Sequence, residues 1–133
     1  EFEEIYYQKA PVELEEIESG PETEIYFGDL YGTRSGDKGG CANLGVWSKD
    51  QKSYSFLYNY LTVAKLKELL PDLKRYKIER YELANINSLN FYIHDILQDG
   101  VSSNNRKDGQ AKSLGEYLRV KKIIVPASIT GEI

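Results

Sequence analysis

The segment spanning residues 32–40, "GTRSGDKGG", gathers residue types that together can bind an anion. Its four glycines permit positive φ angles and let successive backbone N–H groups converge on one point, as in an anion-binding nest. Arg34 offers a planar fork for a carboxylate or phosphate, Lys38 a point charge, and Asp37 a carboxylate that can orient both cations. The alternative is a hairpin loop whose glycines only serve tight turns and whose Arg34–Asp37 pair is structural. The residues alone leave both interpretations open.

Known motifs for phosphate binding and for serine nucleophiles do not fit this segment. A P-loop requires G-x-x-x-x-G-K-[ST] at the start of a helix, whereas Gly32 and Gly36 are four apart and Asp37 stands directly before Lys38. The dinucleotide-binding pattern also needs a helix after the glycines, and the residues that follow here have the pattern of a strand. The letters "SGDK" match S-x-x-K, but the surrounding glycines make a poor helix, so the lysine amine would not be held beside the serine.

Composition limits the class of protein. The chain has 133 residues, 41% of them hydrophobic and 29% charged, which suits one globular domain. Cys41 is the only cysteine, which excludes an internal disulfide and favours a cytoplasmic location, and with His94 as the only histidine a Cys/His zinc site is almost excluded. No apolar run is long enough to span a membrane and no signal peptide opens the chain. We therefore expect no metal, no cofactor and no membrane contact.

Charge divides the chain into two parts. Residues 1–30 hold ten acidic residues against Lys9 alone, whereas residues 31–133 hold sixteen Lys and Arg against eleven Asp and Glu. We interpret residues 1–22 as an acidic leader or linker and residues 23–133 as the domain, whose mildly basic surface either suits anionic ligands or is an ordinary solvated face. The chain has no methionine, even at position 1, so we expect a domain from a longer protein. The eleven tyrosines do not indicate nucleic-acid binding in an acidic chain without a recognised motif.

Hydrophobic periodicity predicts both strands and helices. Alternating or β-branched runs predict strands at 23–30, 41–48, 75–83 (with a bulge near 79–80) and 120–126, with a loop at 32–40. Helical spacing predicts a helical run over 54–70, in which Thr62 caps a second segment and Pro71 ends the run. A short apolar helix or turn is predicted to end the stretch 85–97, followed by a polar loop at 99–112 and a helix capped by Ser113 with Glu116. This order predicts an α+β domain with helices packed on one sheet.

Four motifs in order resemble those of the acyclic terpene utilisation (AtuA) family, in its C-terminal domain. They are "TRSGDKGGCANLGVW", "YNYLTVAKLKELLP", "YELANINSLNFYI" and "DGVSSNNRKDGQAKSLGEYL", which lie between residues 33 and 118, and the resemblance covers roughly residues 23–126. The resemblance implies a ferredoxin-like sandwich with helices on one face of a four-stranded, mainly antiparallel sheet. It also implies either a small free-standing protein or the tail of a larger one, associated with the breakdown of branched acyclic terpenoids through CoA thioesters. Ala84 departs from the family, which often has proline there.

The resemblance also carries the candidate ligand-binding residues. They are Arg34, Ser35, Gly36, Asp37, Lys38, Gly39, Asn43, Asn85, Asn90, Arg106 and Asp108. Asn85, Asn87 and Asn90 could supply amide donors and acceptors to a ligand, or act as turn and cap residues. If the segment 34–39 forms a site, we expect Asn85, Asn90 or Arg106 to lie in contact with it. We expect His94 to be structural and Cys41 to be a buried structural thiol.

Three functions follow from these residues. The first is a domain, not catalytic in isolation, that binds a carboxylate, a CoA-type phosphate or an acyl-CoA in acyl or terpenoid catabolism. The second is an assembly module that docks on a larger AtuA-type domain or on a second copy of itself. The third is a stand-alone enzyme that uses Asp37, Lys38 or Ser35 in acid–base chemistry.

Overall fold

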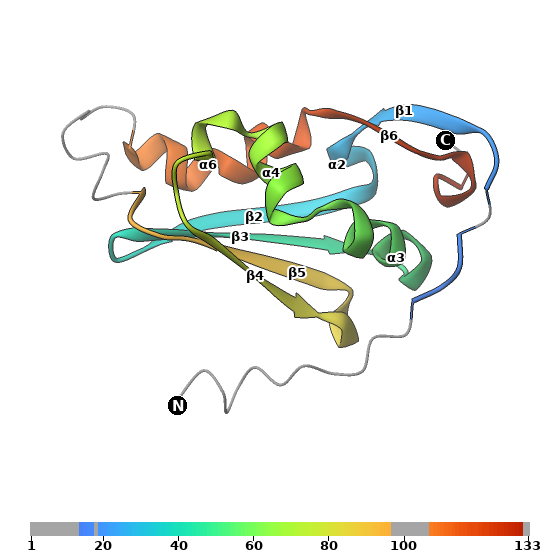
Figure 1. The fold of residues 1–133 in the computed structure, drawn as a ribbon, viewed down its shortest axis with the longest axis horizontal. Helices are drawn as coiled ribbons and strands as arrows, with labels where there is room; N and C mark the ends of the chain where they lie inside the picture. Colours follow the sequence, from blue (N-terminus) through green and yellow to red (C-terminus); the bar gives the residue numbers. More distant parts are fainter. Residues whose placement is uncertain (1–13, 18, 97–106, 132–133) are drawn as a thin grey trace.

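The computed structural model describes residues 14–17, 19–96 and 107–131. Its main sheet has four strands in the order β2-β3-β5-β4, and every neighbouring pair is antiparallel. The bounds of these strands are Tyr31–Lys38 (β2), Cys41–Ser48 (β3), Ser88–Ile93 (β5) and Ile78–Leu83 (β4). Helices α3 (Gln51–Tyr60), α4 (Val63–Leu69) and α6 (Lys107–Arg119) lie on one side of this sheet (Figure 1). The α+β ferredoxin-like class predicted from the sequence is therefore confirmed.

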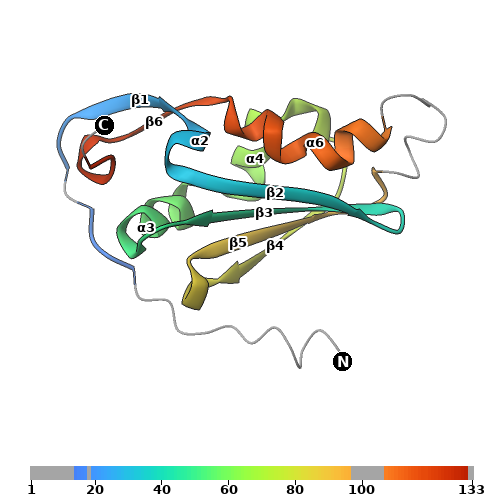
Figure 2. The same cartoon turned by 180° about the vertical axis from the view of Figure 1, so that it is seen from behind.

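The chain order divides this core into two similar halves. In each half a β-hairpin is followed by helix: β2 and β3 precede α3 and α4, and β4 and β5 precede α6. The halves join through the antiparallel pairing of β3 with β5. A separate two-stranded sheet of β1 (Glu22–Tyr26) and β6 (Lys122–Pro126) lies on the helical side, beside the short helix α2 (Phe27–Leu30) (Figure 2).

The core lies between the sheet and the helices because the central strands alternate with a period of two. Every second residue of β3 and β5 points towards the helices and is fully buried: Ala42, Leu44, Val46, Leu89, Phe91 and Ile93. Helix α6 contributes Leu114 and Leu118, which lie one helical turn apart on its sheet-facing side. The intervening residues of the strands point to the other side of the sheet.

The helices begin where the sequence provides capping side chains. The Asp50 carboxylate accepts a hydrogen bond from the Ser53 N–H at 2.7 Å at the start of α3, and the Thr62 hydroxyl accepts one from Lys65 N–H at 3.0 Å at the start of α4. Pro71 ends the helical run and opens the 3-10 turn η1 (Pro71–Leu73). The predicted cap at Thr62 and the predicted stop at Pro71 are confirmed. The predicted helix start at Ser113 is wrong, because α6 already begins at Lys107.

The membership of the main sheet differs from the prediction. The predicted strands at the two ends of the domain pair with each other as β1 and β6, outside the main sheet. The first of them ends at Tyr26, whose N–H donates to the Asp29 carboxylate at 2.9 Å, and the chain turns into α2. Strands β2 and β5 take their places. The sequence did not predict β2, because its glycines and charged residues have low strand propensity. It did not predict β5, because asparagines precede that strand.

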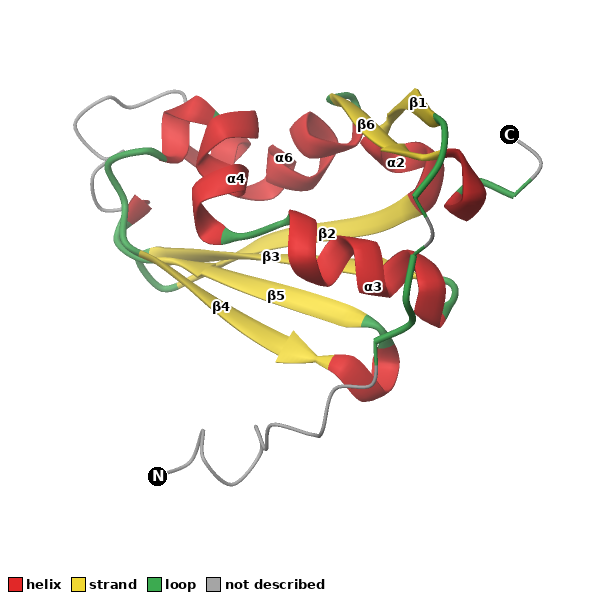
Figure 3. Ribbon diagram, turned by 45° about the vertical axis from the view of Figure 1, so that its right-hand side comes forward, coloured by secondary structure: helices red, strands yellow, loops and turns green. Residues whose placement is uncertain are grey.

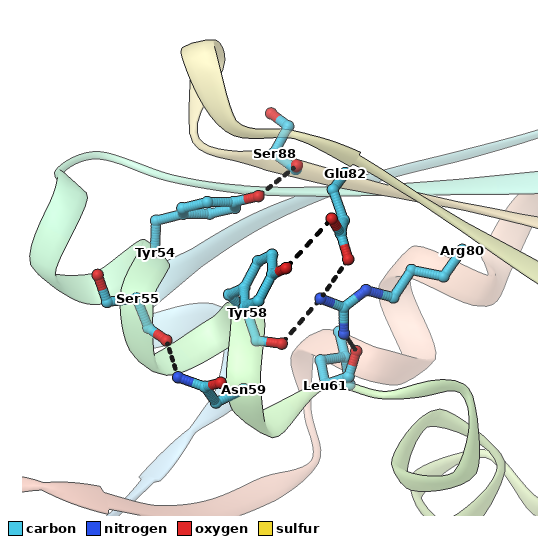
Figure 4. A network of polar contacts seen from close by, with 8 residues as sticks. All are labelled: Tyr54, Ser55, Tyr58, Asn59, Leu61, Arg80, Glu82 and Ser88. Atoms are coloured by element: carbon cyan, nitrogen blue, oxygen red, sulfur yellow. Dashed lines mark hydrogen bonds and ion pairs between the residues drawn. The ribbon is translucent and has the colours of Figure 1, made fainter. Parts of the chain in front are cut away.

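Arg80 explains the apparent phase slip in β4, where the sequence predicted a bulge. The ladder between β4 and β5 continues without one, so Arg80 and Glu82 point to the helical side of the sheet. There the Arg80 guanidinium donates to the carbonyl oxygens of Leu61 and Tyr58, both at 2.8 Å, and lies 4.9 Å from the Tyr58 ring centroid. Its Nη2 is 3.4 Å from the Glu82 carboxylate, which also accepts from the Tyr58 hydroxyl at 3.3 Å (Figure 4).

This network ties β4 to the end of α3. The C-terminal carbonyl groups of a helix have no partners within the helix and carry a partial negative charge, which a guanidinium satisfies well. Side-chain exposure is only 13% for Arg80 and 17% for Glu82, so loss of one partner leaves the other nearly buried without compensation.

Arg80→Ala should lower the free energy of unfolding by about 3 kcal/mol, because two carbonyl oxygens and a nearly buried carboxylate lose their donor. For a domain of this size that corresponds to a fall in Tm of about 10 °C, measurable by circular dichroism. Lys77→Ala, with a side chain 73% exposed at the start of the same strand, is the control and should change stability by about 0.5 kcal/mol or less. The double variant Arg80→Leu/Glu82→Leu should recover part of the loss, and equal stability of Arg80→Ala and the control would contradict this role.

Candidate functional site

The side of the sheet opposite the helices is polar, and among the described residues no helix lies over it (Figure 3). We call it the open face. The register places its residues in cross-strand rows, each running from β2 through β3 and β5 to β4. Three rows are complete: Gly32, Trp47, Ser88 and Leu83; Arg34, Gly45, Asn90 and Tyr81; Gly36, Asn43, Tyr92 and Glu79.

The segment that the sequence predicted as a loop forms one edge of this face. Residues 31–38 are strand β2, paired with β3 along their whole length, and only the tip at residues 39–40 is a turn. Gly39 has φ of +61°, the left-handed region that favours glycine in a tight hairpin. Along an extended strand, successive N–H groups point to opposite sides, so the predicted convergence of backbone N–H groups on one anion is wrong for residues 32–38.

The middle of the open face brings together residues from two separated motifs. Arg34 is exposed at the β2 edge, Asn90 lies two strands away, and Gly45 lies between them. The Asn43 Nδ2 donates to Asn90 Oδ1 at 3.4 Å, a long hydrogen bond that leaves both amides with capacity for other partners. Strands are about 4.8 Å apart, so Arg34 and Asn90 stand roughly 10 Å apart across a floor without a side chain.

The glycines of the open face differ in what they require. A Cβ at Gly32 would overlap the Trp47 indole, which lies over it, so this glycine makes room for the ring. A Cβ at Gly36 would stay 3.7 Å from Asn43 Oδ1, and one at Gly45 would stay 3.6 Å from Asn90 Oδ1. These are ordinary contacts, and neither glycine has a positive φ. Folding therefore does not require glycine at 36 or 45, and their effect is to keep the middle of the open face low.

Ser35 lies on the other side of β2, beneath α6. Its hydroxyl accepts a hydrogen bond from the Gly115 N–H at 3.0 Å, while the Thr33 hydroxyl donates to the Gly115 carbonyl at the same distance. A Cβ at Gly115 would stand 2.9 Å from Thr33 Oγ1 and 3.2 Å from Thr33 Cβ. Gly115 thus lets α6 approach β2 closely, and the two hydroxyls fix its position. Asp37 points to the same side as Ser35 and is exposed.

The remaining candidate residues are more dispersed. Asn85 follows β4 at the end of the sheet marked by Trp47, six residues along β3 from the hairpin tip, which is about 20 Å at roughly 3.3 Å per residue. Asn85 therefore lies far from the hairpin tip, whereas Asn90, another of the three residues of which one was expected to contact the segment 34–39, lies in the same row as Arg34. Lys38 stands in register with Cys41, and Asp108 lies in the first turn of α6, but the side chains of both fall outside the described part of the structure, as does the whole of Arg106.

A protein-family model for the AtuA ferredoxin-like domain matches residues 26–124. The chain belongs to this family. Its matched span agrees with the described domain from the end of β1 to β6. No curated protein and no solved structure matches the chain.

The open face of this AtuA-type domain continues into a hydrogen-bonded cluster on β4 and β5. The Tyr81 hydroxyl donates to Glu79 Oε1 at 2.8 Å, and His94 Nε2 lies 3.4 Å from the same oxygen. The hydrogen bond from Tyr81, aided by His94 and Lys77, holds the pKa of the Glu79 carboxyl below its usual value. His94 also packs edge-on against Tyr92, with ring centroids 4.8 Å apart. Glu79 thus places a negative charge on the β4 side, away from Arg34.

Two further expectations concerned the Cys41 thiol and a bound metal ion. The Cys41 thiol is half-buried and free, which corrects the expectation of a buried thiol. It begins β3 at the rim of the sheet, next to the turn, where packing is incomplete. Among residues 14–17, 19–96 and 107–131, no group of three or more His, Cys, Asp or Glu residues could hold a metal ion. Within the same ranges, no helix is long and apolar enough to cross a membrane.

Sequence reasoning missed two features of the site. They are the ring of Trp47 at one end of the open face and the Glu79–Tyr81 pair at the other. Neither was recognised as part of a functional motif. Their signal was the period of two: Trp47 shares the parity of Gly45 in β3, and Tyr81 and Glu79 share one parity in β4. The assumed bulge near residue 79 shifted that parity and concealed the second pair.

Substitution of the glycines should separate those that folding needs from those that it does not. Gly115→Val should lower the free energy of unfolding by about 2 kcal/mol, because the new side chain cannot fit against Thr33, and Tm should fall by about 7 °C. Gly36→Ala and Gly45→Ala should leave Tm unchanged or slightly higher, since alanine reduces the entropy of the unfolded chain. Thermal unfolding of the three variants tests this, and a loss at Gly45 as large as that at Gly115 would make Gly45 structural.

Proposed function

We propose that this domain binds a small molecule bearing a carboxylate or phosphate on the open face of its sheet. Arg34 supplies the charged fork, and Asn43 and Asn90 supply neutral amide donors and acceptors. The observation that supports this most strongly is the row formed by Arg34, Gly45 and Asn90. Its central glycine leaves space that the fold does not need.

The charges on the face favour a ligand that is anionic at one end. Arg34 is exposed at the β2 edge, whereas the ionised Glu79 stands on β4, three strands across. An anion is therefore attracted to the Arg34 side and repelled from the Glu79 side, which would orient an asymmetric molecule across the sheet. The half-buried rings of Tyr81 and Tyr92 lie along the path and could contact an apolar tail.

Membership of the AtuA ferredoxin-like family suggests the setting of this binding. The family association with acyclic terpenoid breakdown points to branched carboxylic acids or their CoA thioesters as the ligand class, and the open face would then hold the acid group or a phosphate. The domain would act by binding, with chemistry supplied by another domain or protein.

The enzyme alternative has less support in the geometry. Ser35, the candidate nucleophile, uses its hydroxyl as an acceptor for the Gly115 N–H beneath α6. Ser35 and Asp37 point to the helical side of β2, whereas Arg34 points to the open face, so the residues of the "RSGD" motif do not converge on one reacting group. A serine nucleophile needs its hydroxyl free and beside a base.

A second candidate function is assembly on a larger AtuA-type domain through the same open face. The observation that favours it is Trp47, which is 41% exposed at one end of the open face. Tryptophan is enriched at the centres of protein interfaces, where its large ring is covered on association.

Titration with isovalerate and with inorganic phosphate tests the first function. Followed by nitrogen–proton correlation NMR, either probe should shift the side-chain amide signals of Asn43 and Asn90, with a dissociation constant of about 1 mM or weaker for one exposed ion pair. Arg34→Ala should weaken binding about five- to thirtyfold, as loss of a charged hydrogen bond of about 1–2 kcal/mol does.

Two controls separate binding from assembly and from charge alone. Lys74→Ala removes an equal charge from the helical side and should leave the titration unchanged. Sedimentation of the wild type and of Arg34→Ala, with and without a larger AtuA-type partner, measures association. If Arg34→Ala still binds the probes as the wild type does, the anion site is excluded. If the wild type binds neither probe and Arg34→Ala loses association with the partner, the assembly function is favoured instead.

A further inference from the structure

A hollow of about 240 Å³ lies at the outer edge of β2, where the strand begins. Its lining includes Gly28, Asp29, Gly32, Trp47, Lys49 and Arg119. These residues come from α2, β2, the end of β3 and the last turn of α6. The hollow thus lies where four elements meet, and it contains none of Arg34, Asn43 or Asn90.

Glycines at two positions shape this hollow. The Trp47 indole lies over Gly32, at a position that any other residue would occupy with its own side chain. On the α2 side, a Cβ at Gly28 would stand 3.2 Å from both the Cβ and the carbonyl oxygen of Arg119, so the absence of a side chain there lets α6 come close. The result is a recess with an aromatic wall, and the indole remains 41% exposed.

The charged residues of the hollow leave it net positive. Lys49, which directly follows β3, and Arg119, the last residue of α6, are both exposed. Among the described residues that line the hollow, the one carboxylate is that of Asp29, which accepts a hydrogen bond from the Tyr26 N–H at 2.9 Å as part of the α2 cap. Two cations beside an exposed indole form a recognition surface for a flat aromatic ring and an attached anion, because the ring stacks while the anion pairs with the cations.

We propose that this hollow, which adjoins the Trp47 end of the open face but excludes Arg34, Asn43 and Asn90, is a second binding site for a planar aromatic ring that carries an anionic group, of the purine nucleoside monophosphate class. Trp47 contacts the ring, and Lys49 and Arg119 hold the phosphate. The volume sets the size of the ligand: 240 Å³ corresponds to about eight water molecules and lies below the roughly 300 Å³ at which pockets for drug-sized ligands begin. One ring system with its phosphate is therefore the part of a ligand that the hollow accepts.

Trp47 is the only tryptophan of the chain, so its fluorescence reports on this site directly. The experiment titrates the full chain with AMP, excited at the red edge of tryptophan absorption, with free N-acetyltryptophanamide as the reference for collisional quenching and absorption. The expected result is saturable quenching with a dissociation constant of about 0.1–1 mM. Adenosine and ribose 5-phosphate, each lacking one half of the recognised chemistry, should bind at least about fivefold more weakly.

The variants locate the phosphate. Lys49→Ala and Arg119→Ala should each weaken AMP binding about fivefold, and raised salt should weaken it in the wild type. Arg119→Ala keeps the Cβ that packs on Gly28, so unchanged circular dichroism is expected. Lys74→Ala, which removes the same charge elsewhere, should bind AMP like the wild type.

Each other outcome decides against the proposal. A dissociation constant above about 10 mM for AMP, equal binding of adenosine or of ribose 5-phosphate, or unchanged binding in the double variant Lys49→Ala/Arg119→Ala overturns it. The result is independent of the open-face function: Arg34→Ala should keep AMP binding while losing isovalerate binding, and the reverse pattern is expected of Lys49→Ala/Arg119→Ala.

Discussion

Strict alternation along the two central strands is the constraint on which the rest of the structure depends. In β3 and β5 the alternate side chains from Ala42 to Val46 and from Leu89 to Ile93 are apolar and fully buried, so one side of the sheet must be covered by α3, α4 and α6. The same alternation directs Asn43, Gly45 and Asn90 to the other side. The polar face, over which no helix lies in the described part of the chain, is therefore a consequence of how the core is built. Its side chains do not contribute to the core, so the need for a core does not explain which residues stand there.

Polar residues that do point into the helical layer each position a helix. Arg80 satisfies the last carbonyl groups of α3, and Thr33 and Ser35 bond both backbone groups of Gly115 in α6. Buried polar groups are tolerated only when they are paired, and here the pairing also fixes where each helix lies on the sheet. Ser35 and Gly115 belong to motifs 80 residues apart, so two parts of the family signature are explained by a single packing contact.

The sequence was sufficient for the fold class, for the cap at Thr62 and for the stop at Pro71, because caps and stops depend on a few neighbouring residues, although the same reasoning placed the start of α6 too late. Thr62 and Pro71 act within one helical turn of where they stand. It was insufficient for β2, whose glycines and charges have low strand propensity and which becomes a strand only because β3 offers it a full ladder of partners. The candidate site shows the same limit: the sequence named Arg34, Asn43 and Asn90 as candidates, but only the strand register shows that they share one side of the sheet and that Ser35 and Asp37 lie on the other.

The glycines of the signature show how structure separates function from architecture. Gly39 has a left-handed backbone, Gly32 lies under an indole, and Gly115 lies under a threonine, so each is explained by the fold. Gly36 and Gly45 have neither a positive φ nor a neighbour within 3.4 Å of a built Cβ. A glycine within a strand costs roughly 0.5–1 kcal/mol relative to alanine. The stability cost of Gly36 and Gly45, beside an exposed arginine and two amides, is explained if a ligand must approach the backbone there. That is the physical basis of the function proposed for this face.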